Sequence, residues 1–148
     1  MRVGTLLDQK DRSLILERLQ HLRPDAKPGW GSLTAPRMLC HVADQMRVAT
    51  GDIPAKATHT LPSRTLLRFL VVNTPLAPPR GKIETAPEML SSHPTSWEAD
   101  LRACMDLAER VGRGLATAVH PTFGPLSPRE WGRLSWKHLN HHLLQFGL

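Results

Sequence analysis

The sequence predicts an all-α protein of one domain, an antiparallel four-helix bundle in which a long connection joins the second and third long helices. Apolar residues recur at helical spacing in four long segments, and no segment of useful length alternates as a β-strand does. Between these segments, the stretch 51–94 holds more than half of the thirteen prolines. A chain of 148 residues can bury a core and has the size of a single domain, residues 1–148.

The first two long helices are bounded by proline and by a capping residue. The first is expected over residues 8–22, where apolar residues recur every three or four positions. It ends before Pro24, because the residue that precedes a proline is disfavoured in the helical conformation. The second begins after Thr34, a residue type that caps helix N-termini, and Pro36 lies in its first turn, where a missing N–H costs little. It continues to about Thr50.

The connection and the last two helices follow. Residues 51–94 are expected to contain one short helix, around Ser63–Val72, and loops of this length are often functional. Thr95 and Glu98 have the spacing of a capping box at the start of the third long helix. Ser127 and Glu130 have the same spacing at the start of the fourth, which runs to about residue 146. The apolar stripe of the third helix consists of Trp97, Leu101, Cys104, Ala108, Val111 and Leu115.

Composition and charge narrow the class of protein. Cys40 and Cys104 are too few for a disulfide framework, so we expect free thiols. The formal net charge of +6 comes from basic residues spread over several segments without a nucleic-acid-binding motif, so we expect no nucleic-acid partner. A basic cleft for a small anionic substrate agrees with the same charge. The longest apolar stretch, Phe69–Val72, is far too short to cross a bilayer, and we expect a cytoplasmic protein.

The segment WKHLNHHLLQF at residues 136–146 carries most of the recognisable chemistry. His138 and His142 are four residues apart, so both imidazoles lie on one face of a helix, one turn apart. At about 100° per residue, both fall within the apolar arc of the helix, which also includes the polar Gln145. His141 falls at the edge of this arc, which predicts a solvent-facing side chain or an outer contact of a metal site. Imidazoles that point into a core need partners, and metal ligation supplies them.

A third histidine, His41, lies in the second predicted helix at the border of its apolar face. Together with His138 and His142 it would form a site of three imidazoles with an open coordination position, as in catalytic zinc centres. Cys40 points away from the centre of that face, which argues against a thiolate ligand. Asp44 is one turn from His41 and is either a carboxylate that orients this ligand or a solvated surface charge.

The segments WGSLTAPRMLCHVADQ and HPTFGPLSPREWGRLSWKHLNHHLLQFG resemble the DinB-like superfamily, most closely a subgroup without an assigned activity. The resemblance extends from about Trp30 to Gly147. It implies a four-helix bundle in which His41, His138 and His142 hold a divalent metal ion, for which we expect zinc or nickel. It also implies thiol-dependent S-transferase or isomerase chemistry with a low-molecular-weight thiol such as bacillithiol, mycothiol or glutathione, and pairing into homodimers. The chain contains no tyrosine, so family chemistry that uses a tyrosine hydroxyl is excluded.

Three functions follow from these expectations. The first is a metal-dependent transferase that activates a thiol for attack on a small electrophile, with Arg64, Arg68, Arg80 or Lys82 as contacts for a carboxylate of the thiol. The second is a metal-dependent hydrolase that activates water, with Asp44 or His141 as the general base. The third is a metal- or ligand-binding bundle without catalysis. Any metal site of neutral histidines should lose affinity below about pH 6.

Overall fold

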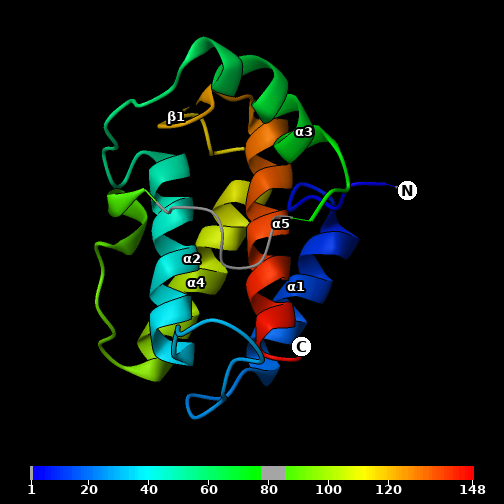
Figure 1. The fold of residues 1–148 in the computed structure, drawn as a ribbon. Helices are drawn as coiled ribbons and strands as arrows, with labels where there is room; N and C mark the ends of the chain where they lie inside the picture. The colour runs from blue at the N-terminus through cyan, green and yellow to red at the C-terminus, as the bar shows by residue number, and fades with distance from the viewer. Residues whose placement is uncertain (1, 78–85) are drawn as a thin grey trace.

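The computed structural model describes residues 2–77 and 86–148, and within these ranges the protein is mostly helical (Figure 1). The expectation of an all-α protein is confirmed at this level. The helices are α1 (Gln9–His21), α2 (Ala35–Thr50), α3 (Arg68–Asn73), α4 (Trp97–Gly112) and α5 (Pro128–Gln145). Shorter elements are the π-helical turn η1 (Ser63–Leu67), the 3-10 turn η2 (Pro87–Leu90) and a small antiparallel hairpin of β1 (Val119–His120) and β2 (Gly124–Pro125).

One of the two predicted capping boxes forms. At the start of α5, the Ser127 hydroxyl accepts from the Glu130 N–H, and the Glu130 carboxylate accepts from the Ser127 N–H. The prediction for α4 was wrong, because that helix begins one residue later and Ser96 is its N-cap. The residue three positions on is then Ala99, which has no side-chain acceptor, and Thr95 donates instead to Asp100.

The end of α4 also differs from the sequence pattern. The apolar spacing continues to Leu115, but the helix ends at Gly112. Gly114 has a φ of 78°, a left-handed conformation that glycine adopts without steric cost, and it turns the chain away from the helix axis. Leu115 is therefore 51% exposed and does not belong to the core stripe in which we expected it.

We expected neighbouring long helices to run antiparallel, and this holds for only some of the helix pairs. The pairs α2/α5 and α1/α4 are antiparallel, as the contacts His41–His138 and Arg12–Glu109 indicate together with the neighbouring contacts along each pair. Helices α2 and α4 run in the same direction, because the Arg110–Asp52 ion pair and the bond from Thr117 N–H to the Ala49 carbonyl join their C-terminal ends. The long connection returns the chain to the starting end of α2 before α4 begins (Figure 1).

The core lies where these four helices meet. Its largest fully buried side chains include Trp131, Leu6, Ile15, Leu19, Met38, Leu39, Met46, Leu139 and Leu143. The Trp131 indole donates to the Ala118 carbonyl and so fastens the segment before the hairpin to α5. None of the helices within the described ranges combines the length and apolar composition needed to cross a bilayer.

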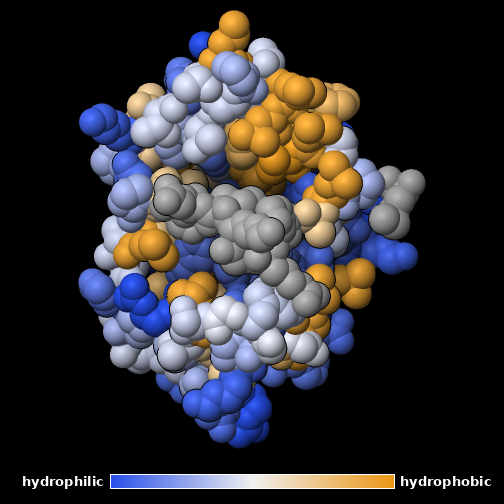
Figure 2. Space-filling view, in the orientation of Figure 1, coloured by the Kyte–Doolittle hydropathy of each residue, from blue (hydrophilic) through white to orange (hydrophobic). Residues whose placement is uncertain are grey.

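Apolar side chains also gather on the outer surface of η1 and α3, where they form the orange area at the upper right of Figure 2. Leu66 is 66% exposed and Phe69 is 58% exposed. On its inner side α3 is held against α5, because Lys137 donates to the carbonyls of Val71 and Thr74 at the end of α3. This anchoring leaves the apolar outer face of the short helix in solvent.

Candidate metal centre

The antiparallel packing of α2 against α5 brings the three predicted ligands together. His41 from α2 lies beside His138 and His142 from α5, and the Nε2 atoms of His41 and His138 are 2.9 Å apart. One potential ligand atom from each residue lies within 4.8 Å of the other two. Since His41 and His138 are 97 residues apart in the sequence, only tertiary packing brings His41 to the other two histidines.

A backbone carbonyl fixes the protonation of His41. Its Nδ1 lies 2.8 Å from the Met89 carbonyl oxygen, which can only accept a hydrogen bond. The proton of the neutral ring is therefore on Nδ1, and the lone pair is on Nε2, which faces His138. A hydrogen bond of this kind from the distal nitrogen is what orients metal-binding histidines in proteins.

A glutamine fixes His142 in the same way. The Gln145 amide nitrogen donates to the Trp30 carbonyl at 2.7 Å, so the amide oxygen faces the other way, toward Nδ1 of His142 at 2.8 Å. Because that oxygen only accepts, Nδ1 of His142 carries the proton and Nε2 is left with the lone pair. Two of the three rings are thus held in the form that presents Nε2 to an ion.

His138 differs from the other two. Among the described residues its Nδ1 is enclosed and has no hydrogen-bond partner. Because the Nε2 of His41 carries a lone pair, the contact between the two Nε2 atoms requires the proton of His138 to be on Nε2. Binding an ion through this nitrogen would require the proton to be on Nδ1, where a buried N–H without an acceptor costs about 1–3 kcal/mol.

Burial keeps the three rings neutral. Desolvation is the main reason why the pKa of His41 is lowered and the pKa of His142 falls to about 4. The pKa of His138 is lowered further, because burial is reinforced by the neighbouring histidines. Neutral imidazole is the form that ligates metals, so the donor set suits a divalent transition-metal ion near neutral pH and below it.

Asp44 is not a surface charge. The residue is 0% exposed, and its carboxylate accepts hydrogen bonds from the N–H and hydroxyl of Ser92, the hydroxyl of Ser91 and the guanidinium of Arg47. The contact expected from Asp44 to the ring of His41 is made by the Met89 carbonyl instead. Asp44 therefore holds the segment that follows η2 against α2, close to the carbonyl that orients His41.

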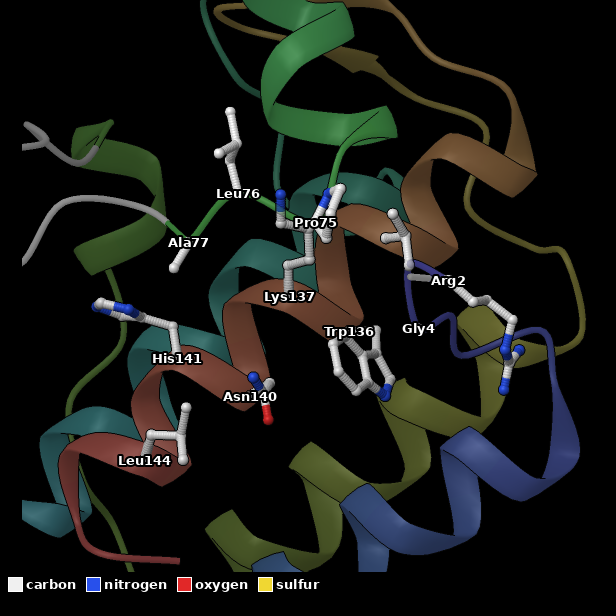
Figure 3. A pocket seen from close by; sticks show the side chains of 11 residues that line it. Arg2, Gly4, Pro75, Leu76, Ala77, Trp136, Lys137, Asn140, His141 and Leu144 are labelled. Carbon is white, nitrogen blue, oxygen red and sulfur yellow. The ribbon is translucent and has the colours of Figure 1, made fainter.

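His141 lies outside the cluster. Its ring packs edge-on against Trp30 and against His142, with ring centroids 6.0 Å and 5.1 Å away. It lies between the cluster and a surface hollow of about 240 Å³, which it lines together with Lys137 and Asn140 (Figure 3). This hollow does not include His41, His138 or His142.

The other histidine near α5, His120, has a structural role. It is buried, and its Nδ1 accepts hydrogen bonds from the N–H groups of Thr122 and Phe123 in the turn of the hairpin. Its ring stacks on Phe123 with centroids 4.5 Å apart. Desolvation lowers its pKa to about 4.

The thiols and the basic residues are not part of the cluster. Cys40 and Cys104 are free and buried, so α2 is more enclosed than its apolar pattern indicates. Desolvation raises both pKa values, that of Cys104 to about 12. Arg68 binds the Glu130 carboxylate through two nitrogens, and the side chain of Arg64 packs against Gly124. Arg80 and Lys82 lie outside the described residues.

Sequence reasoning missed the groups that surround the ligands. Gln145 gave a signal, since it was the polar residue inside the apolar arc of the last helix. Met89 gave none, because its contribution is a backbone carbonyl that any residue offers. Gln45 and Ser135 form a further buried pair, in which the Ser135 hydroxyl donates to the amide oxygen of Gln45 at 3.2 Å.

Comparisons of the chain with protein-family models, curated proteins and solved structures find no match. The resemblance to the DinB-like superfamily therefore remains an expectation from the sequence segments quoted above. The geometry supports a more general statement than the family resemblance does. A buried group of three neutral histidines, from two helices, is suited to hold a metal ion.

Proposed function

We propose that His41, His138 and His142 bind one divalent metal ion, zinc or nickel, and that the protein is a metal-dependent transferase of the DinB-like four-helix-bundle type. The main support for the metal site is that Met89 and Gln145 place the protons of His41 and His142 on Nδ1, which leaves each Nε2 with a lone pair. A helical core needs no such arrangement, since two apolar residues would fill the same space without polar groups to satisfy. The expected homodimer belongs to the same proposal.

The thiol used in the transfer comes from outside the chain. Cys40 and Cys104 are buried, and their raised pKa values keep them protonated, so neither is a nucleophile. When bound, a divalent ion with three neutral imidazole ligands keeps its positive charge and open positions, and it lowers the pKa of a thiol or water molecule that binds there. A low-molecular-weight thiol and a small electrophile are therefore the proposed reactants.

Metal content tests the first half of the proposal. Protein purified without a histidine tag should contain about one equivalent of ion, and His41→Ala, His138→Ala and His142→Ala should each abolish it. His141→Ala is the matched control, because His141 is adjacent in sequence to His142 but is not one of the three grouped histidines and lines a surface hollow that includes none of them. If His141→Ala lost the ion while His142→Ala kept it, the proposed set of metal ligands would be wrong.

Dependence on thiol tests the second half. The metal-loaded protein is incubated with an electrophile such as 1-chloro-2,4-dinitrobenzene or p-nitrophenyl acetate, with and without glutathione or bacillithiol. Thiol-dependent conversion that disappears in His142→Ala is the expected result. Conversion of the ester without thiol would instead identify a hydrolase, and an occupied site that converts neither compound would identify a non-catalytic metal-binding protein.

A further inference from the structure

Gln45 occupies the layer of the core next to the histidines. It follows His41 by four residues on α2, and its partner Ser135 precedes His138 by three residues on α5. Because α2 and α5 are antiparallel, the pairs His41–His138 and Gln45–Ser135 are successive layers, one helical turn or roughly 5 Å apart. The amide of Gln45 is thus the polar group adjoining the ligand cluster on this side.

The amide nitrogen of Gln45 has no partner among the described residues. The residue is 3% exposed, the nitrogen is enclosed, and the amide oxygen already accepts from Ser135. A buried N–H group without an acceptor costs about 1–3 kcal/mol, and a methionine or leucine of similar size would avoid that cost. A buried donor one layer from the three histidines therefore suits an acceptor atom that the described residues do not supply.

A second glutamine gives a comparison within the same helix pair. Gln145 adjoins His142 on the opposite side of the cluster, and both ends of its amide have partners, His142 and the Trp30 carbonyl. One glutamine thus fixes a ligand, whereas the other leaves its donor free. The difference separates an amide that supports the histidines from an amide that is open to an additional group.

The charges around the three histidines indicate which kind of group would accept the hydrogen bond from Gln45. The Asp44 carboxylate near His41 is occupied by Ser91, Ser92 and Arg47, and the groups that act electrostatically on His138 are other histidines. Three neutral imidazoles leave the double positive charge of a bound ion uncompensated. An anionic oxygen is attracted by that charge and accepts a hydrogen bond from an amide N–H.

We infer that the Gln45 amide N–H is a binding group for an anionic oxygen of the substrate, a carboxylate or an oxyanion, at the three-histidine centre. This inference rests on the proposed metal site and adds the class of ligand that it accepts. Gln45 binds the ligand oxygen while Ser135, by donating to the amide oxygen, holds the amide in the orientation that presents its N–H.

Cobalt(II) and acetate test this assignment without any turnover. The protein is loaded with cobalt, whose visible absorption reports both its binding and the arrival of an additional ligand, and acetate is then titrated. We expect Gln45→Met to bind cobalt as tightly as the wild type but to bind acetate roughly tenfold to a hundredfold more weakly, the effect of losing one hydrogen bond to a charged group. Gln145→Leu is the matched control, with cobalt affinity reduced about tenfold or more, because Gln145 supports His142.

The double variant Gln45→Met/Ser135→Ala is the control for an effect of the substitution on folding. It replaces both members of a buried polar pair by apolar groups, so its free energy of unfolding without metal should equal or exceed that of the wild type. Unchanged acetate affinity in Gln45→Met would overturn the inference while leaving the metal site intact. A loss of cobalt affinity in Gln45→Met would also overturn it, since Gln45 would then belong to the ligand set. A wild-type protein that binds no cobalt would overturn both proposals.

Discussion

The amide of Gln145 decides which nitrogen of His142 carries the proton, and it does so because the Trp30 carbonyl accepts from its other end. The Met89 carbonyl does the same for His41. Single hydrogen bonds at the distal nitrogens thus give two core histidines a defined lone pair on Nε2. His138 lacks such a partner within the described part of the chain, and its proton would have to move to Nδ1 for Nε2 to bind an ion.

Acid stability is predicted to depend on His120. Its pKa is lowered from 6.5 to about 4 in the folded protein by burial. The unfolded chain therefore binds more protons below pH 6.5, and the free energy of unfolding falls as the pH drops from 6.5 toward 4. The shift corresponds to a loss of roughly 3 kcal/mol over this window, and to no further loss from this residue below it.

His120→Asn isolates that effect. Asparagine offers an oxygen to the N–H groups of Thr122 and Phe123 but does not titrate. Urea unfolding of the metal-free proteins at pH 7, 6, 5 and 4.5 should give a wild-type stability that declines more steeply than that of the variant. Parallel curves for the two proteins would show that His120 does not contribute.

At the scale of the elements, α2 organises the centre through both of its faces. One face presents His41 and Gln45 to α5, and the carboxylate of Asp44 holds the segment that follows η2. Because η2 contains Met89, this attachment positions the carbonyl that orients His41. The proline-rich connection is therefore joined to the three-histidine cluster at its far end.

Asp44→Asn is predicted to loosen η2. A neutral amide offers one acceptor oxygen in place of two charged ones, and the loss of charge-assisted bonds from buried donors should cost about 2–3 kcal/mol of stability. The amide hydrogen of Ser92, which donates to Asp44, should exchange faster, and metal affinity should fall because His41 is held less firmly. Hydrogen exchange followed by mass spectrometry and a competing chromophoric chelator measure the two effects.

Asp100→Asn is the control for that variant. Asp100 accepts two hydrogen bonds from Thr95 at an exposed helix start, far less enclosed than Asp44. Its substitution should cost about 1 kcal/mol or less and should leave metal affinity unchanged. Equal effects of the two substitutions on metal affinity would mean that η2 does not position the centre.

For the whole molecule, the ion would join two helices that are distant in sequence and run in opposite directions. Binding to the folded state alone should stabilise it by about 2.7 kcal/mol at a free metal concentration one hundred times the dissociation constant. For a chain of this length, that corresponds to a rise in Tm of roughly 5–10 °C.

Calorimetry checks this linkage. The increase in Tm with zinc or nickel should vanish on addition of a chelator and should be absent in His41→Ala, in which α2 contributes no ligand. His141→Ala should keep the increase, because His141 is not one of the three grouped histidines. A shift of the same size in His41→Ala would place the ion elsewhere.

The sequence by itself predicted the long helices and named His41, His138 and His142 as candidate ligands. Apolar spacing and the Ser127–Glu130 box located α5, and the spacing of His138 and His142 placed both rings on one face. Such signals are local, because they depend on residues within one or two helical turns. They go wrong where a single residue shifts the end of a helix, as Ser96 and Gly114 do for α4.

Tertiary structure alone decided how these pieces combine. The pairing of α2 with α5 brought His41 beside His138, and the parallel course of α2 and α4 followed from the long connection. Packing on every side of α2 buried Asp44 and Cys40. A helical wheel describes one helix with one apolar face, whereas burial depends on every element that packs around it. For the same physical reason two polar neighbours of the three histidines, the Met89 carbonyl and the Gln45 amide, became recognisable only in the folded protein.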